Sequence, residues 1–237
     1  MKTLKIVVIT CLVTVAASAQ KIIEKSFVYD NQFITLAVKF ARNIEIKTWD
    51  EKKVYFKATV ITEEERFIDK YEVNFEESSS YITIEEQAKP LFKAMQEYAK
   101  KNDWKNREYW YNAGDRYKFY YVLYVPQGAK FKVESINGDL ESERIDGDFE
   151  ADLINGDIQI KAYSGLLTLK TINGEIDLKV GNVDFIAETV NGDIYADEKL
   201  KLTSDNKRVG QKVQGLASNS GTRLKLKTVN GNMYLRL

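Results

Sequence analysis

Hydrophobic and polar residues alternate along much of the chain between residues 20 and 86. Ile44, Ile46 and Thr48 alternate with charged residues, a polar break follows at residues 49–52, and apolar side chains then occupy every second position over residues 54–60. A period of two on both sides of a short polar break is typical of a β-hairpin with one buried face. We therefore predict that these two strands pair, and that a similar hairpin spans residues 71–84.

The period changes to that of a helix over residues 88–103. Apolar side chains recur there at helical spacing, and Pro90 stands near the start, where its missing N–H does least harm. Nine aromatic residues follow between Trp104 and Tyr124. The last of them belong to residues 117–125, which read as a buried strand. This is the only helix that the pattern predicts after residue 20.

A five-residue motif recurs with a fixed period of about 18 residues from Ile136 onward. It consists of Ile or Val, then Asn-Gly, then an acidic residue and an apolar residue; the last copy has a second Asn in place of the acid. Weaker copies lie halfway between the early ones. The final copy comes slightly more than two periods after the fourth, as a small insertion would give. The asparagines of the motif are Asn137, Asn155, Asn173, Asn191 and Asn230.

Two architectures fit this repeat. Asn-Gly between apolar residues is a strong hairpin signal and would suit an antiparallel meander. However, Ile136 and Leu140 are four residues apart and would share one face of a strand, whereas Leu140 and Ile145 are five apart. We therefore favour a chain that runs extended through the motif and turns between motifs. The predicted fold is all-β: a β-solenoid, like a β-helix, with coils of about 18 residues, preceded by an N-terminal β region that carries one inserted helix.

Stacked coils would place the asparagines of the motif above one another, about 4.8 Å apart, where their amides can form a structural ladder. We expect the ladder to follow chain order from Asn137 to Asn230. Residues 203–222, rich in Ser, Asn, Gly and Lys, are expected to form a loop. The predicted organisation is a signal peptide at 1–19, a β-strand region at 20–132, and the repeat at 133–237, continuous with it.

The first residues have the three parts of a secretory signal peptide: Lys2 and Lys5, an apolar run, and the small-residue exit Ala17-Ser18-Ala19. The apolar run is too short to span a bilayer, which takes about 20 residues. Cleavage after Ala19 would leave no membrane span and an exported protein that is periplasmic, on the cell surface or secreted. Cys11 lies inside the run rather than at its end, which argues against a lipoprotein.

Composition excludes several classes of function. Cleavage would remove the only cysteine and two lysines, leaving 33 basic and 35 acidic residues, a balance that gives no support for nucleic-acid binding. The chain has no histidine, so Ser-His-Asp and Cys-His catalysis are both excluded. An enzyme here would need carboxylates, lysine or tyrosine. We predict no enzyme activity and no cofactor.

The acidic residues of the motif form a second expected column. Calcium-binding β-rolls use three glycines per repeat, whereas each repeat here has one glycine and Leu166 interrupts the column. We therefore expect solvated, outward carboxylates and no metal site. Paired carboxyl groups at a defined separation can also cleave sugars when one has a raised pKa. A carboxylate-dependent polysaccharide enzyme on a β-helix remains the alternative.

Four aromatic residues in a polar context are the predicted ligand-binding residues: Trp104, Tyr109, Trp110 and Tyr111. Their flat rings suit stacking on sugars or peptides. The other interpretation is that they cap the open end of the repeat, where a stack would otherwise expose its core.

The motif, preceded by an aromatic strand that ends in Val125-Pro126-Gln127-Gly128, resembles the secreted β-strand-repeat adhesins of unknown function (the DUF4097 and head-GIN type). Residues 44–50 look like the same family's first strand. Against that pattern, residues of about 87–114 look like an insertion. The resemblance implies a non-enzymatic exported cell-envelope protein, an adhesin or binding scaffold, with a cell-surface glycan or an envelope protein as partner. A structural or envelope-stress protein is the further alternative, and the oligomeric state stays open.

Overall fold

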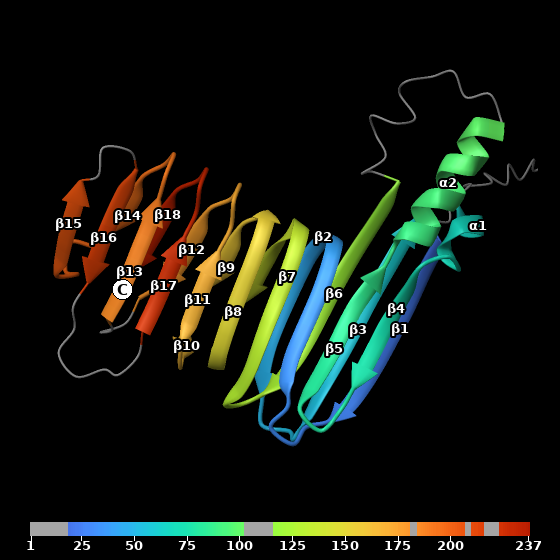
Figure 1. Cartoon of the computed structure of the whole chain (residues 1–237), viewed down its shortest axis with the longest axis horizontal. Coiled ribbons are helices and arrows are strands. Elements are labelled where there is room, and N and C mark those ends of the chain that lie inside the picture. The colour runs from blue at the N-terminus through green and yellow to red at the C-terminus, as the bar shows by residue number, and fades with distance from the viewer. Residues whose placement is uncertain (1–18, 102–115, 181–183, 207–209, 216–222) are drawn as a thin grey trace, which may run out of the picture.

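The computed structural model describes residues 19–101, 116–180, 184–206, 210–215 and 223–237, and most of these lie in β-strands (Figure 1). The all-β class predicted from the sequence is confirmed. The predicted signal peptide, apart from Ala19, falls outside the described residues.

The elements lie in the following order along the described chain. They are β1 (Ala19–Val28), β2 (Phe33–Trp49), β3 (Lys53–Thr62), α1 (Glu65–Ile68), β4 (Glu72–Glu77), β5 (Tyr81–Gln87), α2 (Lys89–Lys101), β6 (Tyr117–Pro126), β7 (Ala129–Ser142), β8 (Ile145–Asn155), β9 (Ile158–Ile160), β10 (Tyr163–Ser164), β11 (Leu167–Lys170), β12 (Ile176–Lys179), β13 (Asp184–Thr189), β14 (Ile194–Ala196), β15 (Leu202–Asn206), β16 (Gln211–Gly215), β17 (Arg223–Lys227) and β18 (Met233–Arg236).

Hydrogen-bonded neighbours divide the strands into two rows, which we call row A and row B. Row A has the order β4, β5, β2, β7, β8, β11, β17, β13, β16, β15. Row B has the order β1, β3, β6, β2, β7, β9, β12, β18, β14. Strands β2 and β7 are long enough to give their first half to row A and their second half to row B. Short β10 pairs with the start of β8.

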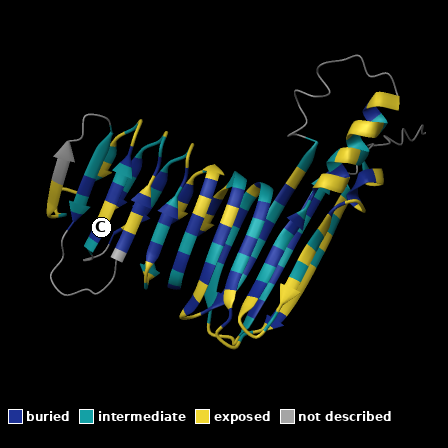
Figure 2. Ribbon diagram, in the orientation of Figure 1, coloured by how far each residue is buried: buried dark blue, intermediate teal, exposed yellow. Residues whose placement is uncertain are grey.

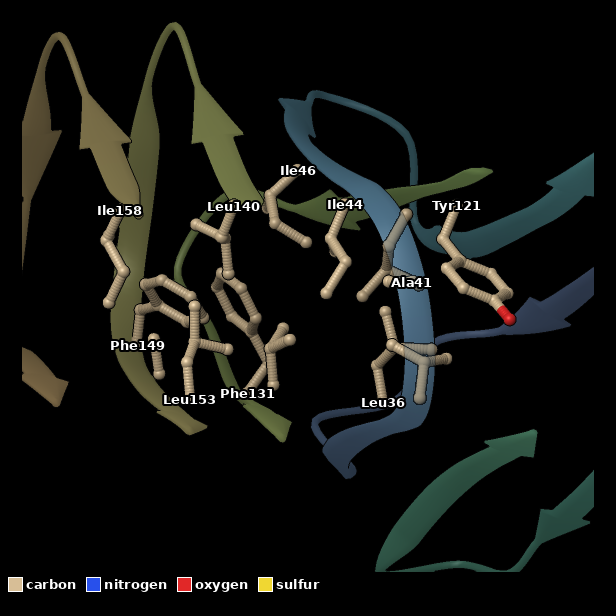
Figure 3. Close-up of a cluster of buried hydrophobic side chains, with 14 of the residues drawn as sticks. Leu36, Ala41, Ile44, Ile46, Tyr121, Phe131, Leu140, Phe149, Leu153 and Ile158 are labelled. Atoms are coloured by element: carbon tan, nitrogen blue, oxygen red, sulfur yellow. The ribbon is translucent and has the colours of Figure 1, made fainter. Parts of the chain in front are cut away.

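The two rows enclose one hydrophobic core. Side chains along each strand are alternately buried and open to solvent (Figure 2), as the period of two dictates. Inward side chains of row A, such as Phe131 and Phe149, meet those of row B, such as Leu140 and Ile158 (Figure 3). The rings of Phe131 and Phe149 stack with their centroids 4.5 Å apart. Each sequence repeat therefore adds one inward-facing layer to each side of the core.

Parallel pairing between successive repeats brings equivalent positions into columns. Leu140 pairs with Ile158, and Ile158 pairs with Ile176. The same holds for the asparagines: Asn155 Nδ2 donates to Asn137 Oδ1 at 3.0 Å, and Asn173 Nδ2 donates to Asn155 Oδ1 at 2.8 Å. Strand β2 continues the columns before the first motif, since Phe40 pairs with Asn137.

The order of the last two units differs from the predicted chain order. Asn230 Nδ2 donates to Asn173 Oδ1 at 2.7 Å, and Asn191 Nδ2 donates to Asn230 Oδ1 at 2.8 Å. Strands β17 and β18 accordingly lie between β11 and β13 and between β12 and β14. The C-terminal unit is inserted between the third and fourth motifs, and the prediction that it lies last in the stack is wrong.

Strand β7 runs unbroken through the first motif, as predicted, but from the second motif on the strands end at the motif and the chain turns there. Leu140 is buried as expected, but Ile154 and Ile172, which precede the asparagine, are 39% and 43% exposed. The residue one place earlier points inward instead, as Thr171 does, and its hydroxyl donates to the Gly156 carbonyl at 3.0 Å. The parity argument placed the first apolar residue of each motif in the core, whereas it lies on the outside of a corner.

The N-terminal strands confirm one predicted hairpin and contradict the other. Strands β4 and β5 pair antiparallel over residues 72–87. Strands β2 and β3, expected to pair with each other, are separated by β6, which runs parallel to β2 and antiparallel to β3. A polar break indicates a turn between two strands, but it does not determine whether those strands pair with each other or with a third strand between them.

Residues 203–222, expected to be a loop, contain two strands. Strands β15 and β16 form an antiparallel hairpin, and β16 pairs antiparallel with β13 at the end of row A. Gln211 Oε1 accepts the Ile194 N–H at 3.1 Å, and Gln211 Nε2 donates to Asp193 Oδ1 at 2.9 Å. This side-chain amide therefore pairs one backbone N–H and one carboxylate oxygen that a further repeat would have paired.

Helix α2, over residues 89–101, agrees with the predicted helix, and the four-residue helix α1 was not predicted. Both lie at the end of the stack formed by the N-terminal strands (Figure 1). Phe92 of α2 packs edge-on against Phe40, with ring centroids 4.7 Å apart. Within the described residues, neither helix has the length and apolar character needed to cross a membrane.

Candidate functional site

The predicted ligand-binding residues Trp104, Tyr109, Trp110 and Tyr111 lie outside the described residues. Their role therefore stays a prediction. A different surface, built from the regular strands, offers a ligand site within the described part of the chain.

A groove of about 610 Å³ lies on the outer face of row B. It crosses the strands from β6 and β2 at one end to β18 at the other, so its length is set by the stacking of the repeat. The groove is lined by Arg42, Asn43, Tyr120, Asp139, Leu140, Glu141, Asp157, Ile158, Gln159, Glu175, Asp177, Tyr234 and Arg236.

One wall of the groove is the acidic column of the motif. The Asp157 N–H donates to Asp139 Oδ1 at 3.0 Å, and the Glu175 N–H donates to Asp157 Oδ1 at 2.8 Å. Each aspartate therefore uses one carboxylate oxygen to hold the backbone of the next unit. Both aspartates are exposed, as predicted, and the hydrogen bonds give them a structural role that was not predicted. The second oxygen remains for a ligand.

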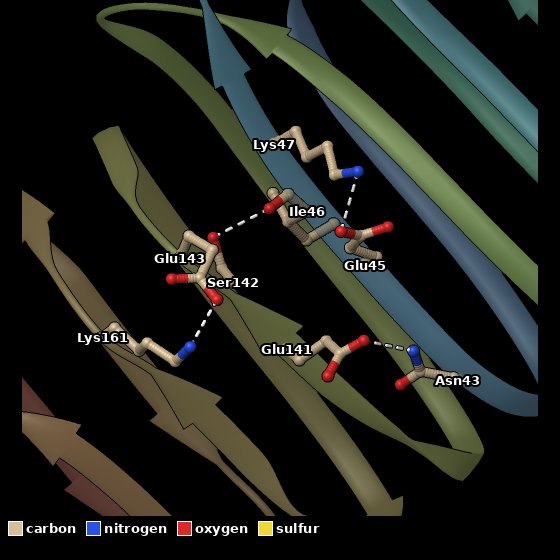
Figure 4. Close-up of polar contacts among 8 residues, drawn as sticks. All are labelled: Asn43, Glu45, Ile46, Lys47, Glu141, Ser142, Glu143 and Lys161. Carbon is tan, nitrogen blue, oxygen red and sulfur yellow. Dashed lines mark hydrogen bonds and ion pairs between the residues drawn. The ribbon is translucent and has the colours of Figure 1, made fainter.

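The floor of the groove is a second polar column, two residues further along each strand of row B. Glu141 accepts a hydrogen bond from Asn43 Nδ2 at 2.6 Å (Figure 4). Asp177 accepts two parallel bonds from the Arg236 guanidinium, both 2.8 Å long. Gln159 lies between them and makes no side-chain hydrogen bond to any described residue. Its amide is the unengaged donor and acceptor in the middle of the groove.

Each end of the groove has one aromatic ring and one arginine. Tyr120 and Arg42 lie at the β6 and β2 end, and Tyr234 and Arg236 lie at the β18 end. The Tyr234 ring stacks on Tyr195, with centroids 5.4 Å apart and planes 12° apart. This contact fixes the plane of Tyr234.

The groove carries a negative charge. Five carboxylates line it against two guanidinium groups, and one of these, Arg236, is neutralised by Asp177. Like-charge repulsion disfavours polyanionic ligands in such a groove, whereas sugar hydroxyls and amines can donate to carboxylate oxygens.

Metal binding finds no support in the geometry of the described residues, which contain no group of three or more His, Cys, Asp or Glu placed to hold an ion. The acidic side chains of the motif lie in a column along the stack. Asp139 and Asp157 bond the backbone of the next unit, and Glu175 accepts from the Asn232 side chain. A calcium ion needs six to eight oxygens converging on one point.

One acid is buried away from the groove. Glu86 is only 4% exposed, and its Oε2 accepts from the Phe40 N–H at 3.1 Å and from the Tyr121 hydroxyl at 3.0 Å. Desolvation by burial raises the pKa of Glu86 above its ordinary value. Its Oε1 has no hydrogen-bond partner among the described residues. The Tyr71 hydroxyl completes the network, 2.6 Å from that of Tyr121.

A second aromatic cluster lies on the outer face of row B, and its position was not predicted. The rings of Trp49 and Tyr124 lie 4.8 Å apart, and Tyr55 lies 5.7 Å from Tyr124. Lys53 and Lys47 lie over the rings of Trp49 and Tyr124. The sequence signal for this cluster was that the three aromatic residues occupy outward-facing positions of β2, β3 and β6. Because β2 was expected to pair with β3, the position of Tyr124 between Trp49 and Tyr55 was not predicted.

Comparison with known proteins assigns no family. No protein-family model matches the chain, and no curated protein sequence matches it. Among solved structures, a proposed cell adhesion protein from Clostridium sporogenes is similar, with 14% identity, a TM-score of 0.46, and coverage of 91% of this chain and 99% of that one. A proposed adhesin from Bacteroides fragilis gives 9% identity, a TM-score of 0.33, and coverage of 91% and 97%. A proposed lipid binding protein from Parabacteroides distasonis gives 8% identity, a TM-score of 0.30, and coverage of 91% and 96%. At these scores and identities the likeness carries no functional conclusion.

Proposed function

We propose that the chain is an exported, non-enzymatic binding scaffold of the cell envelope, and that the groove on row B binds an extended, uncharged or amino-bearing glycan. The scaffold itself is best described as a two-sided β-solenoid. Parallel pairing of equivalent positions in successive repeats, with one strand of each unit in row A and one in row B, supports that description.

The groove is the observation that carries the proposal. A chain of sugar rings lying along it would meet Tyr120 at one end and Tyr234 at the other, where aromatic faces can stack on the apolar face of a ring. Between them, Gln159 and the carboxylates of both columns can bond hydroxyl groups. Planar polar side chains between two aromatic rings suit a polar, elongated ligand better than a compact apolar one.

The alternative, a polysaccharide-cleaving enzyme, needs a pair of carboxyl groups of which one is protonated. Burial raises the pKa of Glu86, but this residue lies in the core, bonded to Phe40 and Tyr121, and does not line the groove. The acids of the groove are engaged in other ways: Asp139 and Asp157 hold backbone N–H groups, and Asp177 holds Arg236. No specific observation favours the enzyme.

A binding screen tests the proposal. The purified protein is applied to arrays of neutral, amino-bearing and anionic glycans and to envelope fractions, beside the double variant Gln159→Ala/Tyr234→Ala. Tyr81→Ala/Gln214→Ala is the matched control, because Tyr81 is 44% exposed on row A and Gln214 lies on the same row.

We expect binding to neutral or amino-bearing glycans that is lost in the groove variant and kept in the row A control. Equal glycan binding by the groove variant and the row A control would contradict the groove proposal. A third variant, Trp104→Ala/Trp110→Ala, separates the two candidate sites, since loss of binding in this variant alone would assign recognition to the aromatic residues predicted from the sequence.

A further inference from the structure

The outer corner of row A carries a line of exposed β-branched side chains that no function described above uses. One residue comes from each unit, at the position before the ladder asparagine. In spatial order this apolar stripe consists of Ile136, Ile154, Ile172, Val229 and Val190.

The stripe is open to solvent along its length. Ile154, Ile172 and Val190 are 39%, 43% and 41% exposed, and Ile136 and Val229 are half-buried. With neighbouring strands about 4.8 Å apart, five positions span about 19 Å. Large exposed side chains scattered singly are ordinary, but an unbroken row of them marks an interaction surface.

The asparagine ladder borders the stripe and lowers the cost of covering it. Each ladder amide after the first donates to the amide before it in the stack, as Asn173 does to Asn155 and Asn230 does to Asn173. Polar groups that are hydrogen-bonded within the chain lose little when water is removed from them.

A column of charged residues borders the stripe on its other side, two positions earlier in each strand. It reads, in spatial order, Glu134, Asp152, Lys170, Lys227 and Glu188. Three of these have an ion-pair partner on their own chain: Glu134 with Lys132, Lys170 with Glu150, and Glu188 with Lys212. Asp152 and Lys227 form no ion pair within 4 Å with a described residue, although Asp152 is close enough to Lys132 to interact with its charge. Asp152 and Ile154 also line one shallow groove of about 230 Å³ on this face.

These two charges, which have no direct ion-pair partner, are placed symmetrically. Ile172 is the middle member of the stripe, Asp152 lies one unit before it, and Lys227 lies one unit after it. A two-fold axis through Ile172 would therefore set Asp152 of one copy opposite Lys227 of the other, twice. It would also set Ile154 against Val229 and Ile136 against Val190. Glu134 and Glu188 would face each other, and Lys170 would face Lys170 of the second copy at the axis. Each of these three residues is already paired with an opposite charge of its own chain.

We propose that this face is a self-complementary interface, on which a second copy of the chain packs antiparallel, stripe against stripe. Two-fold dimers use the same patch on both subunits, which is the arrangement that the symmetric charges provide. The β-branched rows interdigitate at the strand spacing, and the Asp152 and Lys227 pairs fix their register.

Sedimentation velocity across a range of concentrations tests the proposal. Wild-type protein should form a dimer at tens of micromolar. Ile172→Lys adds two buried lysines to the Lys170 pair at the two-fold axis and should weaken dimerisation about 30-fold or more, as loss of a central hot spot does. Ile22→Lys is the matched control, because Ile22 is 51% exposed on β1, at the far end of row B.

The charge pairs allow a rescue. Asp152→Lys alone and Lys227→Asp alone should each weaken the dimer, and the double swap Asp152→Lys/Lys227→Asp should restore it. A wild-type protein that stays monomeric at every concentration overturns the proposal and leaves the stripe to another partner. The proposal is also overturned if the double swap dimerises no more tightly than the single variants. The same holds if Ile22→Lys weakens the dimer as much as Ile172→Lys does.

Discussion

The glycine of each motif lies against the backbone of the unit before it. A Cβ atom on Gly174 would be 2.0 Å from the Gly156 carbonyl oxygen, and one on Gly156 would be 2.1 Å from the Gly138 carbonyl oxygen. The obstacle is backbone within a hydrogen-bonded strand, so it cannot rotate away as a side chain would. Close packing between units therefore explains the glycine column.

Gly174→Ala should lower the free energy of unfolding by about 3 kcal/mol or more, the upper range for overpacking. Gly128→Ala is a useful control, because its added methyl group meets no atom within 4 Å and the substitution only strains a φ of 74°. That variant should lose about 1 kcal/mol. Urea denaturation compares the two, and a Gly174→Ala variant as stable as wild type would contradict the packing account.

The buried carboxyl of Glu86 should make stability depend on pH. Because the folded state raises the pKa of Glu86, it binds more protons than the unfolded state once pH passes the unfolded value of about 4.3. The free energy of unfolding should therefore fall as pH rises through the window between the unfolded and the folded pKa.

Glu86→Gln should remove this loss, since the amide oxygen can still accept from Phe40 and Tyr121. Relative to wild type, the variant should gain stability as pH rises from 4 towards neutrality. Glu85→Gln is the control, because Glu85 lies on the outer face and pairs with Lys39 at 3.7 Å. Urea denaturation at several pH values measures both, and parallel profiles for wild type and Glu86→Gln would refute the assignment.

Single residues were partly predictable from the sequence. The regular spacing of the motif identified the asparagine and glycine columns, because a fixed period gives each position the same neighbours in every unit. The inward position of Glu86 was not predicted, although its alternation with Ile82 and Ile84 was the available sequence signal. The exposed Ile154 was wrongly placed, because Asn-Gly was read as part of a strand rather than as a corner.

At the scale of elements, two insertions define the fold. Strand β6 enters between β2 and β3, and the C-terminal unit, β17 and β18, enters between the third and fourth motifs. Neither insertion can be predicted from the local pattern of hydrophobic and polar residues. A period reports that units stack but not in which order, and the segment that joins β14 to β17 is long enough to place the last unit at either position.

Engineered disulfides test this order. The variant Asn173→Cys/Asn230→Cys places two thiols on adjacent strands, within the Cα separation of about 4.4–6.8 Å that a disulfide accepts. Asn173→Cys/Asn191→Cys is the control, since those strands are two steps apart, or about 9.6 Å. Mass spectrometry after mild oxidation should find the first bond and not the second. The reverse result would restore the chain order predicted from the sequence.

At the scale of the whole molecule, the groove exists only because remote segments are brought together. Tyr120, Gln159 and Tyr234 come from three parts of the chain, and the stacking of units aligns them along one face of row B. The outward positions of the repeat were visible in the sequence, but Tyr120 joins them through the unpredicted insertion of β6. Tyr234 joins them through the insertion of the last unit. The candidate site was therefore less predictable than the repeat that builds it.

Side-chain footprinting tests the central claim most directly. Hydroxyl radicals modify exposed tyrosines, and mass spectrometry locates the modified residues with and without a bound glycan or envelope fraction. We predict that the ligand protects Tyr120 and Tyr234 and leaves Tyr81 on row A as reactive as before. Protection of Tyr81, or unchanged reactivity at both Tyr120 and Tyr234 while ligand is bound, would contradict the proposal that the groove on row B is the binding site.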